Sequence, residues 1–275
     1  MVKFIADSAC DLKEYPGICF ETVPLSISTD ERDYTDDEGL DVHEVLDYLA
    51  SYNNRSFTAS PTTESWLKAF EGADEIYCVT ITSGLSGTYS GANVAKEMYL
   101  SEHPDAKIYV VDSLSTGPGM VLLLEKLAEL KSQGKSFEEV CAAIEKYRKR
   151  LKLYFSLSSL HNLAQNGRVS KIIASAIGFM NIKILGTASK EGTIEQVGKC
   201  RGNNRMIDKI IEQLKESGFT AGKIRICHVE CLEFANAVAD KIRSIFNCSD
   251  IKIVPARGLC SYYAERGGII IGCET

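Results

Sequence analysis

The fold is decided by the segment Glu75-Ile-Tyr-Cys-Val-Thr-Ile-Thr82, which is followed directly by Ser83-Gly-Leu-Ser-Gly-Thr-Tyr89. The first part is rich in β-branched and aromatic residues, which is typical of a strand buried on both faces. The small residues of the second part lead into a helix that is expected to run to about Tyr99. The unit recurs as a strand at Lys107–Asp112 and a helix at Met120–Ser132. Strands that alternate with helices predict a parallel sheet covered on both faces.

The rest of the first half extends this pattern. Its further expected elements are strands at Val2–Ala6 and Thr22–Ser28, and helices at Asp41–Tyr52, Thr63–Phe70 and Ser136–Arg150. Pro61 fits the first turn of a helix, where its missing N–H costs little, and Ser136 fits an N-cap. The stretch Asp30–Asp41 carries seven carboxylates and is expected to be a solvated loop.

The second half has a different organisation. Its expected elements are strands at Lys152–Leu157, Lys223–His228, Asp250–Pro255 and Gly268–Gly272, a hairpin formed by Ile182–Ser189 and Thr193–Lys199, and helices at Leu160–Gln165, Gly202–Ser217 and Leu232–Phe246. This order predicts an antiparallel or mixed sheet with helices on one face. We therefore expect an α/β protein of two domains with a boundary near Arg150. Residues 1–150 would form a Rossmann-like parallel-sheet domain and residues 151–275 an α/β sandwich.

The composition of the chain argues against several classes of function. The 275 residues include 31 basic and 37 acidic ones, giving a net charge of -6, and an acidic surface repels the phosphates of nucleic acids. No apolar stretch approaches the roughly 20 residues of a membrane span, so we expect no stable membrane insertion. The ten cysteines include no Cys-x-x-Cys pair. They are interpreted as reduced packing residues of a cytoplasmic protein rather than as metal ligands. No phosphate-binding glycine motif is present, and no cofactor is expected.

Thr82-Ser-Gly-Leu-Ser-Gly-Thr88 is the strongest local signal for a site. A helix start exposes backbone N–H groups that favour an anion. Ser86 and Thr88 add hydroxyls, while Gly84 and Gly87 permit close approach. Two other interpretations remain open. The segment is also compatible with an ordinary Ser/Gly turn with an N-cap, or with a hydrolase centred on Ser86, although Thr88 stands where a nucleophile elbow requires its second glycine.

Two further places favour the anion interpretation. Thr58-Ala-Ser-Pro61 is rich in hydroxyls and precedes a predicted helix. Asn166-Gly-Arg168 presents, after a glycine turn, an arginine whose forked donors suit a carboxylate. These segments are expected to converge on a carboxylate or a phosphate.

Six segments stand out, in this order: Asp7-Ser-Ala-Cys-Asp-Leu12, Thr58-Ala-Ser-Pro61, Leu85-Ser-Gly-Thr-Tyr89, Val111-Asp-Ser113, Leu163-Ala-Gln-Asn-Gly-Arg-Val-Ser170 and Lys199-Cys-Arg-Gly202. Together they resemble the motifs of the DegV family of bacterial fatty-acid-binding proteins. The resemblance implies two α/β domains with one long-chain fatty acid in an apolar tunnel between them. It does not specify chain length, unsaturation or oligomeric state.

The resemblance also implies how the ligand is held and used. The fatty-acid carboxylate would be bound by Thr58, Ser86 and Arg168, with Gly87 and Thr88 beside Ser86. The protein would present this carboxylate to a separate fatty acid kinase and would do no chemistry itself.

One motif departs from the family pattern. The family's T-H-x-G-P-G aligns with Tyr263-Ala-Glu-Arg-Gly-Gly268, so Ala264 replaces the expected histidine. Tyr262, Tyr263 and Arg266 are candidates to compensate for the missing polar partner. Three functions therefore stay open: a fatty-acid binder, a binder of a different lipid, and a serine hydrolase of lipid or small esters centred on Ser86.

Overall fold

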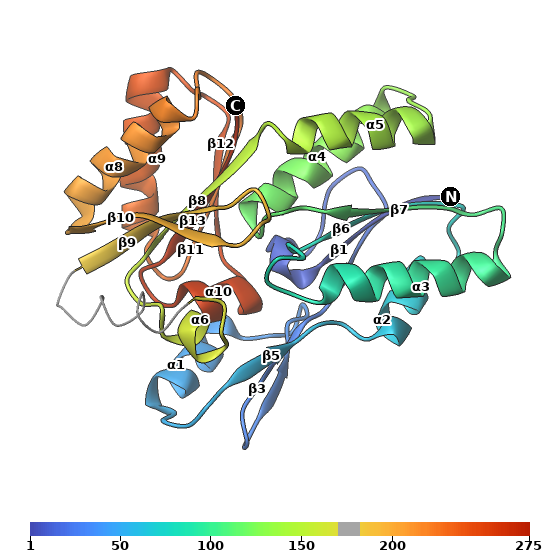
Figure 1. The fold of residues 1–275 in the computed structure, drawn as a ribbon, viewed down its shortest axis with the longest axis horizontal. Coiled ribbons are helices and arrows are strands. Elements are labelled where there is room, and N and C mark those ends of the chain that lie inside the picture. The colour runs from blue at the N-terminus through green and yellow to red at the C-terminus, as the bar shows by residue number, and fades with distance from the viewer. Residues whose placement is uncertain (170–181) are drawn as a thin grey trace.

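The computed structural model describes residues 1–169 and 182–275 of the chain. This part contains three sheets with helices packed around them (Figure 1). Ser170, the last residue of one predicted motif, lies outside the described residues.

The first sheet is parallel and has the strand order β2-β1-β6-β7. Its strands are β1 (Val2–Asp7), β2 (Phe20–Val23), β6 (Glu75–Thr80) and β7 (Lys107–Asp112). Both faces are covered, because alternate side chains of each strand pack on opposite helix layers. One face packs on α4 (Pro118–Ser132) and α5 (Phe137–Arg148), and the other on α2 (Thr63–Phe70) and α3 (Thr88–Glu102). The predicted parallel sheet is confirmed.

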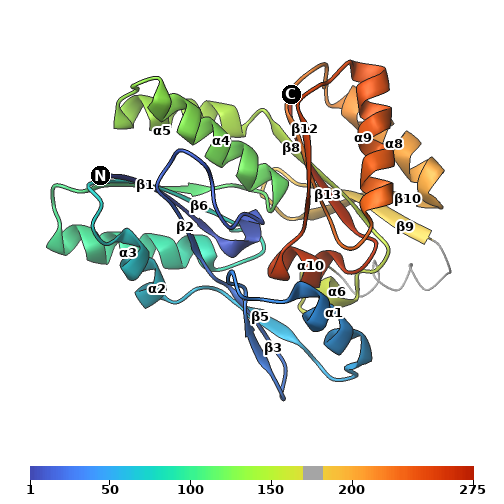
Figure 2. The same cartoon turned by 180° about the vertical axis from the view of Figure 1, so that it is seen from behind.

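The second sheet is mixed, with the strand order β10-β9-β8-β13-β11-β12. Only β11 and β12 pair in parallel. Its strands are β8 (Leu151–Leu157), β9 (Ile182–Ala188), β10 (Ile194–Arg201), β11 (Ile224–His228), β12 (Ile251–Pro255) and β13 (Ile269–Glu274). The helices α8 (Asn203–Glu216) and α9 (Leu232–Phe246) cover the face that points away from the parallel sheet (Figure 2). The predicted mixed sheet is confirmed. Helices were expected on one face only, but α4 and the helix α10 (Gly258–Ala264) pack on the opposite face.

A third, small antiparallel sheet was not predicted. It has the strand order β4-β3-β5 and consists of β3 (Ser26–Ser28), β4 (Asp33–Thr35) and β5 (Phe57–Ala59). The single strand expected at Thr22–Ser28 was wrong, because the chain leaves the parallel sheet at Val23 and enters this sheet at Ser26. Pro24 lies at the break, and its missing N–H cannot continue a strand ladder.

The acidic stretch is not simply a solvated loop. It supplies β4, and Asp36 is only 1% exposed. The Asp36 carboxylate accepts the backbone N–H groups of Gly258 and Leu259, both at 3.0 Å. These N–H groups begin α10 (Gly258–Ala264), a helix that the sequence pattern did not predict.

The helices α1 (Val42–Ser51) and α6 (His161–Gln165) agree closely with expectation. The 3-10 turn η1 (Ser8–Cys10) was not predicted. Ser136 caps α5 as predicted, in a capping box with Glu139. Pro61 does not lie in the first turn of α2, because Thr62 is the N-cap of that helix. No helix among residues 1–169 and 182–275 is long and apolar enough to cross a membrane.

Replacement of Asp36 by alanine should destabilise the protein. Asp36→Ala would strand two buried N–H donors at the start of α10, and we expect the free energy of unfolding to fall by about 2–3 kcal/mol. Urea denaturation measures this change. The neighbouring Glu38→Ala is the control, because Glu38 is exposed. Equal stability of the two variants would show that Asp36 does not hold α10.

Candidate functional site

An apolar cavity opens where the ends of β6 and β7 face the mixed sheet. Its empty volume is about 840 Å³, a figure that includes open solvent at its mouth. The cavity is lined by the segments after β6 and β7, by the inner faces of β8 and β13, and by parts of α10 and the β9–β10 turn. Leu25, Thr58, Leu163 and Arg168 complete the lining from other parts of the chain. The apolar members include Leu25, Ile81, Leu85, Leu114, Leu153, Phe155, Leu157, Leu163, Ile194, Leu259 and Ile270.

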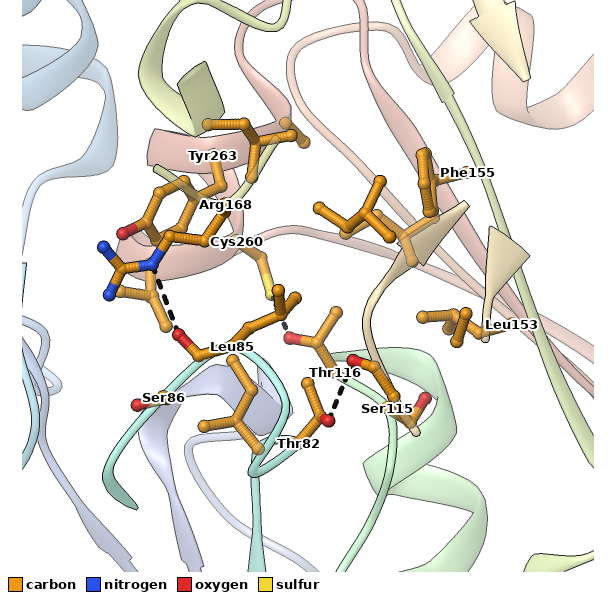
Figure 3. A pocket seen from close by; sticks show the side chains of 18 of the residues that line it. Thr82, Leu85, Ser86, Ser115, Thr116, Leu153, Phe155, Arg168, Cys260 and Tyr263 are labelled. Atoms are coloured by element: carbon orange, nitrogen blue, oxygen red, sulfur yellow. Dashed lines mark hydrogen bonds between the residues drawn. The ribbon is translucent and has the colours of Figure 1, made fainter. Parts of the chain in front are cut away.

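The cavity has a polar side and an apolar side. Ser86, Arg168 and Tyr263 gather on one side, and Leu153 and Phe155 lie on the other (Figure 3). Thr58, which lies on β5, also lines the cavity, and its hydroxyl is 2.7 Å from that of Tyr263. An amphiphilic ligand would fit this division.

The Ser86 hydroxyl lies at the start of α3 among other hydroxyls. It is 2.8 Å from the Thr88 hydroxyl and 3.2 Å from that of Ser60. Thr88 is fully buried and Gly87 is the N-cap of α3, and neither of these two residues lines the cavity. Thr88 can therefore orient Ser86 rather than contact a ligand.

Gly84 was expected to let a ligand come close, but in the structure it lets another segment of the chain come close. A Cβ atom at Gly84 would lie 2.6 Å from the carbonyl oxygen of Glu191, in the β9–β10 turn. The Thr82 hydroxyl donates to the carbonyl of Gly192 in the same turn, at 2.9 Å. Gly84 thus allows this turn to dock against the segment after β6, rather than making room for a ligand.

Arg168 brings a positive charge to the polar side. Its Nε donates to the Leu85 carbonyl at 3.2 Å, and one Nη donates to the Asn166 carbonyl at 2.5 Å. These carbonyls fix the guanidinium plane without neutralising it. Within residues 1–169 and 182–275, no carboxylate forms an ion pair with Arg168. The site therefore presents a cation suited to an anionic group.

Of the three residues proposed to compensate for Ala264, only Tyr263 lines the cavity. Tyr262 is fully buried elsewhere, where its hydroxyl is 2.7 Å from that of Ser56 and accepts a hydrogen bond from the Asn166 amide at 2.9 Å. Arg266 is half-exposed and forms ion pairs with Asp47 and Glu230. Ala264 itself lines the cavity.

Sequence reasoning missed several lining residues. Cys260 lies in the middle of the cavity, 3.4 Å from the Thr116 hydroxyl, and Ser115 lies beside Thr116 (Figure 3). The place of Ser115 and Thr116 after β7 was one available signal, because ligands of open parallel sheets bind at the carboxyl ends of the strands. No such signal pointed to Cys260, which lies on the unpredicted α10.

The surroundings of Ser86 do not resemble a hydrolase. Within the described parts of the chain, its side chain bonds only to hydroxyls and to a backbone N–H, and no histidine or carboxylate contacts it as a base. No group of three or more metal-ligating side chains is found among these residues either.

A family model described as "Uncharacterised protein, DegV family" matches residues 1–273. The chain belongs to the DegV family. A curated relative, a DegV domain-containing protein of Streptococcus pneumoniae, is 41% identical over 99% of this chain and 98% of its own length.

Solved structures of DegV proteins are closely similar. A DegV family protein from Eubacterium eligens, loaded with heptadecanoic acid, is 50% identical, has a TM-score of 0.99 and is matched over 100% of both chains. The Fatty Acid Kinase (Fak) B3 protein of Streptococcus pneumoniae, loaded with linoleic acid, is 41% identical, has a TM-score of 0.97 and is matched over 99% of both chains.

Two buried aspartates close to the cavity have pKa values well above the ordinary value of an aspartate. Burial raises the pKa of Asp7 to about 7, although its carboxylate accepts N–H groups from Ile81 and Ala9. Burial likewise raises the pKa of Asp11 to about 7, against the N–H group of Arg257. An aspartate in an unfolded chain has a pKa of about 3.9, so the folded state binds more protons at intermediate pH.

Stability contributed by these carboxyl groups should fall as pH rises. The loss begins above about pH 4 and is complete above about pH 7, with a slope of up to about 1.4 kcal/mol per pH unit for each group. We expect Asp7→Asn to have a shallower decline between about pH 5 and pH 7 than the natural protein. Urea denaturation across this range checks the slope, with the exposed Asp105→Asn as control. A slope identical in Asp7→Asn and the natural protein would contradict the assignment.

Proposed function

We propose that this DegV protein binds a long-chain fatty acid in the cavity. The observation that carries the proposal is an apolar cavity with one polar side, at which Arg168 has no carboxylate partner among the described residues. The two similar structures, from Eubacterium eligens and Streptococcus pneumoniae, were loaded with heptadecanoic acid and linoleic acid. Their ligands support a fatty acid over a different class of lipid.

Tight binding of a fatty acid requires both the apolar and the polar side of the cavity. Burying about 14 methylenes contributes at most roughly 11 kcal/mol, and association costs about 4–15 kcal/mol. Affinity therefore depends on a preformed cavity and on a paired carboxylate, because an unpaired buried charge would cost several kcal/mol more.

We infer that Thr58, Ser86 and Arg168 hold the carboxylate, with Thr88 orienting Ser86 and Gly87 leaving space beside it. Tyr263 compensates for Ala264, since its hydroxyl reaches Thr58. Thr58, Ser86 and Arg168 are all partly exposed, whereas Phe155 at the apolar side is buried. The carboxylate would thus lie nearer to solvent than the acyl chain.

This exposure supports presentation of the carboxylate to a separate fatty acid kinase. We also infer that the domains divide near Arg150, with the ligand between them, because the parallel sheet ends at Asp112 and the mixed sheet begins at Leu151. A cytoplasmic location is inferred from the ten free thiols, which suit a reducing compartment.

Fatty acid should accompany the protein through native purification. Mass spectrometry of an organic extract should detect a long-chain fatty acid, and delipidated protein should bind one again in a titration. A bound lipid of another class, with no rebinding of fatty acid, would contradict the proposal.

Replacement of Ser86 should weaken binding without unfolding the protein. Ser86→Ala removes a hydroxyl donor from the carboxylate, and we expect a loss of roughly 1–3 kcal/mol in binding free energy. A fluorescent fatty-acid displacement titration measures it. Ser101→Ala is the matched control, because Ser101 lies near the far end of α3, the helix that Ser86 precedes. Unchanged affinity in Ser86→Ala would remove Ser86 from the carboxylate site.

A further inference from the structure

One glycine of the mixed sheet lies beneath an aromatic side chain of the cavity. Gly186 is on β9 and pairs directly with Phe155 on β8, in an antiparallel register. Phe155 lines the apolar side of the cavity, opposite the residues proposed to hold the carboxylate (Figure 3). Both residues of the pair are buried. The pair therefore lies where the methyl end of a bound acyl chain is expected.

The ring of Phe155 occupies the space that a side chain at position 186 would need. A Cβ atom added to Gly186 would lie 2.3 Å from both Cε2 and Cζ of this ring. The φ of Gly186 lies outside the left-handed region, so its backbone conformation does not itself require glycine. The ring reaches across to β9 and covers the glycine, an arrangement known to stabilise glycine in antiparallel sheets.

Strand alternation places this ring on the face of β8 that forms the wall of the cavity. Leu153, Phe155 and Leu157 all line the cavity. Tyr154 points to the opposite face, where its hydroxyl donates to the Gln213 carbonyl of α8 at 3.2 Å. Phe155 is the aromatic member of the three cavity-facing residues, so its ring orientation has the largest effect on the shape of this wall.

The position of the ring sets how far the cavity extends on its apolar side. Because the ring lies across Gly186, it stays close to the sheet and leaves the space above it to the acyl chain. A methyl group at position 186 would displace the ring. The sheet blocks movement on one side, and the cavity that the ring already lines is the empty space on the other. A displaced ring would therefore shorten the cavity.

We propose that Gly186 and Phe155 together determine the longest acyl chain that this protein binds. The Phe155 ring forms the wall that the methyl end of the chain contacts. Gly186 does not line the cavity among the described residues, and it is a positioning residue that acts through the ring. This inference rests on the proposed fatty-acid function, which it makes specific for chain length.

A competition series of saturated fatty acids on the delipidated full chain tests the proposal. Lauric, myristic, palmitic, stearic and arachidic acid each displace one fluorescent fatty acid. Ratios between competitors are compared, so that weaker binding of the fluorescent probe cancels. Gly186→Ala should weaken binding of stearic acid at least about tenfold relative to myristic acid, because each buried methylene is worth roughly fourfold in affinity. Phe155→Leu removes the ring and should shift the preference in the opposite direction, toward arachidic acid.

Gly198→Ala is the matched control for the change at Gly186. Gly198 lies on β10, the strand beside β9, and the nearest neighbours of a Cβ atom there would be side-chain atoms of Lys209, at 3.6–3.9 Å. This variant should keep the chain-length preference of the natural protein.

The double variant Gly186→Ala/Phe155→Leu separates the ring from the backbone. A Cβ atom at position 186 would also lie 2.8 Å from the carbonyl oxygen of Glu195 on β10, and this contact remains in the double variant. With no ring to displace, the change at Gly186 should no longer shorten the preferred chain.

An unchanged ratio of stearic to myristic acid in Gly186→Ala would overturn the inference and leave fatty-acid binding intact. So would the same shift in Gly198→Ala, or a shortening that persists in the double variant. If the natural protein binds none of the acids, the proposed function fails and the inference fails with it. Thermal unfolding verifies that each variant is folded. If Gly186→Ala is not, Phe155→Leu decides alone, and an unchanged preference in that variant overturns the inference.

Discussion

Backbone N–H groups buried beneath a cavity need acceptors, and three aspartates supply them here. Asp7 accepts from Ile81 at 2.6 Å and Asp11 from Arg257 at 2.7 Å, while Asp36 accepts from the first two residues of α10. Each carboxylate joins segments that are far apart in the chain. An unpaired buried N–H would cost about 1–3 kcal/mol, so these bonds fix where the segments lie.

The walls of the cavity depend on these bonds. Asp7 holds the backbone directly before the segment that carries Leu85 and Ser86. Asp11 and Asp36 hold the start of α10, which carries Cys260 and Tyr263 into the cavity. The polar side of the site thus assembles from elements that are far apart in the sequence. The buried aspartates hold these elements in place relative to one another.

The regular elements could be predicted from local patterns, because burial on one or both faces imposes a period on the sequence. The predicted bounds of α9, Leu232–Phe246, coincide with those in the structure. By contrast, α10 has only seven residues, and its start is capped by Asp36, more than 200 positions away. No local pattern records such a long-range cap. The strand β5, which places Thr58 beside Tyr263, escaped prediction because it has only three residues and pairs with β3, a strand far from it in the sequence.

The candidate site could be predicted in part. Local motifs indicated the hydroxyls and Arg168, and the structure places Thr58, Ser86, Arg168 and Tyr263 around one cavity. Tyr262 could not be separated from Tyr263 by sequence. Because neighbouring helical positions point in directions about 100° apart, one of these side chains enters the cavity and the other is buried beside Ser56.

The glycines show why a motif can be recognised correctly and explained wrongly. Gly84 precedes the helix start that was expected to bind an anion, and anion binding alone would account for its small size. The structure gives a different cause, since the β9–β10 turn packs against it and the Thr82 hydroxyl bonds to Gly192. Gly192 is itself constrained, with φ at +73° and a Cβ position 2.0 Å from the Thr82 hydroxyl. A side chain at either glycine would force the turn away from the segment after β6, and both of these segments line the cavity. The requirement for glycine therefore comes from the fit between the two halves of the protein, and the same fit sets the position of this wall of the cavity.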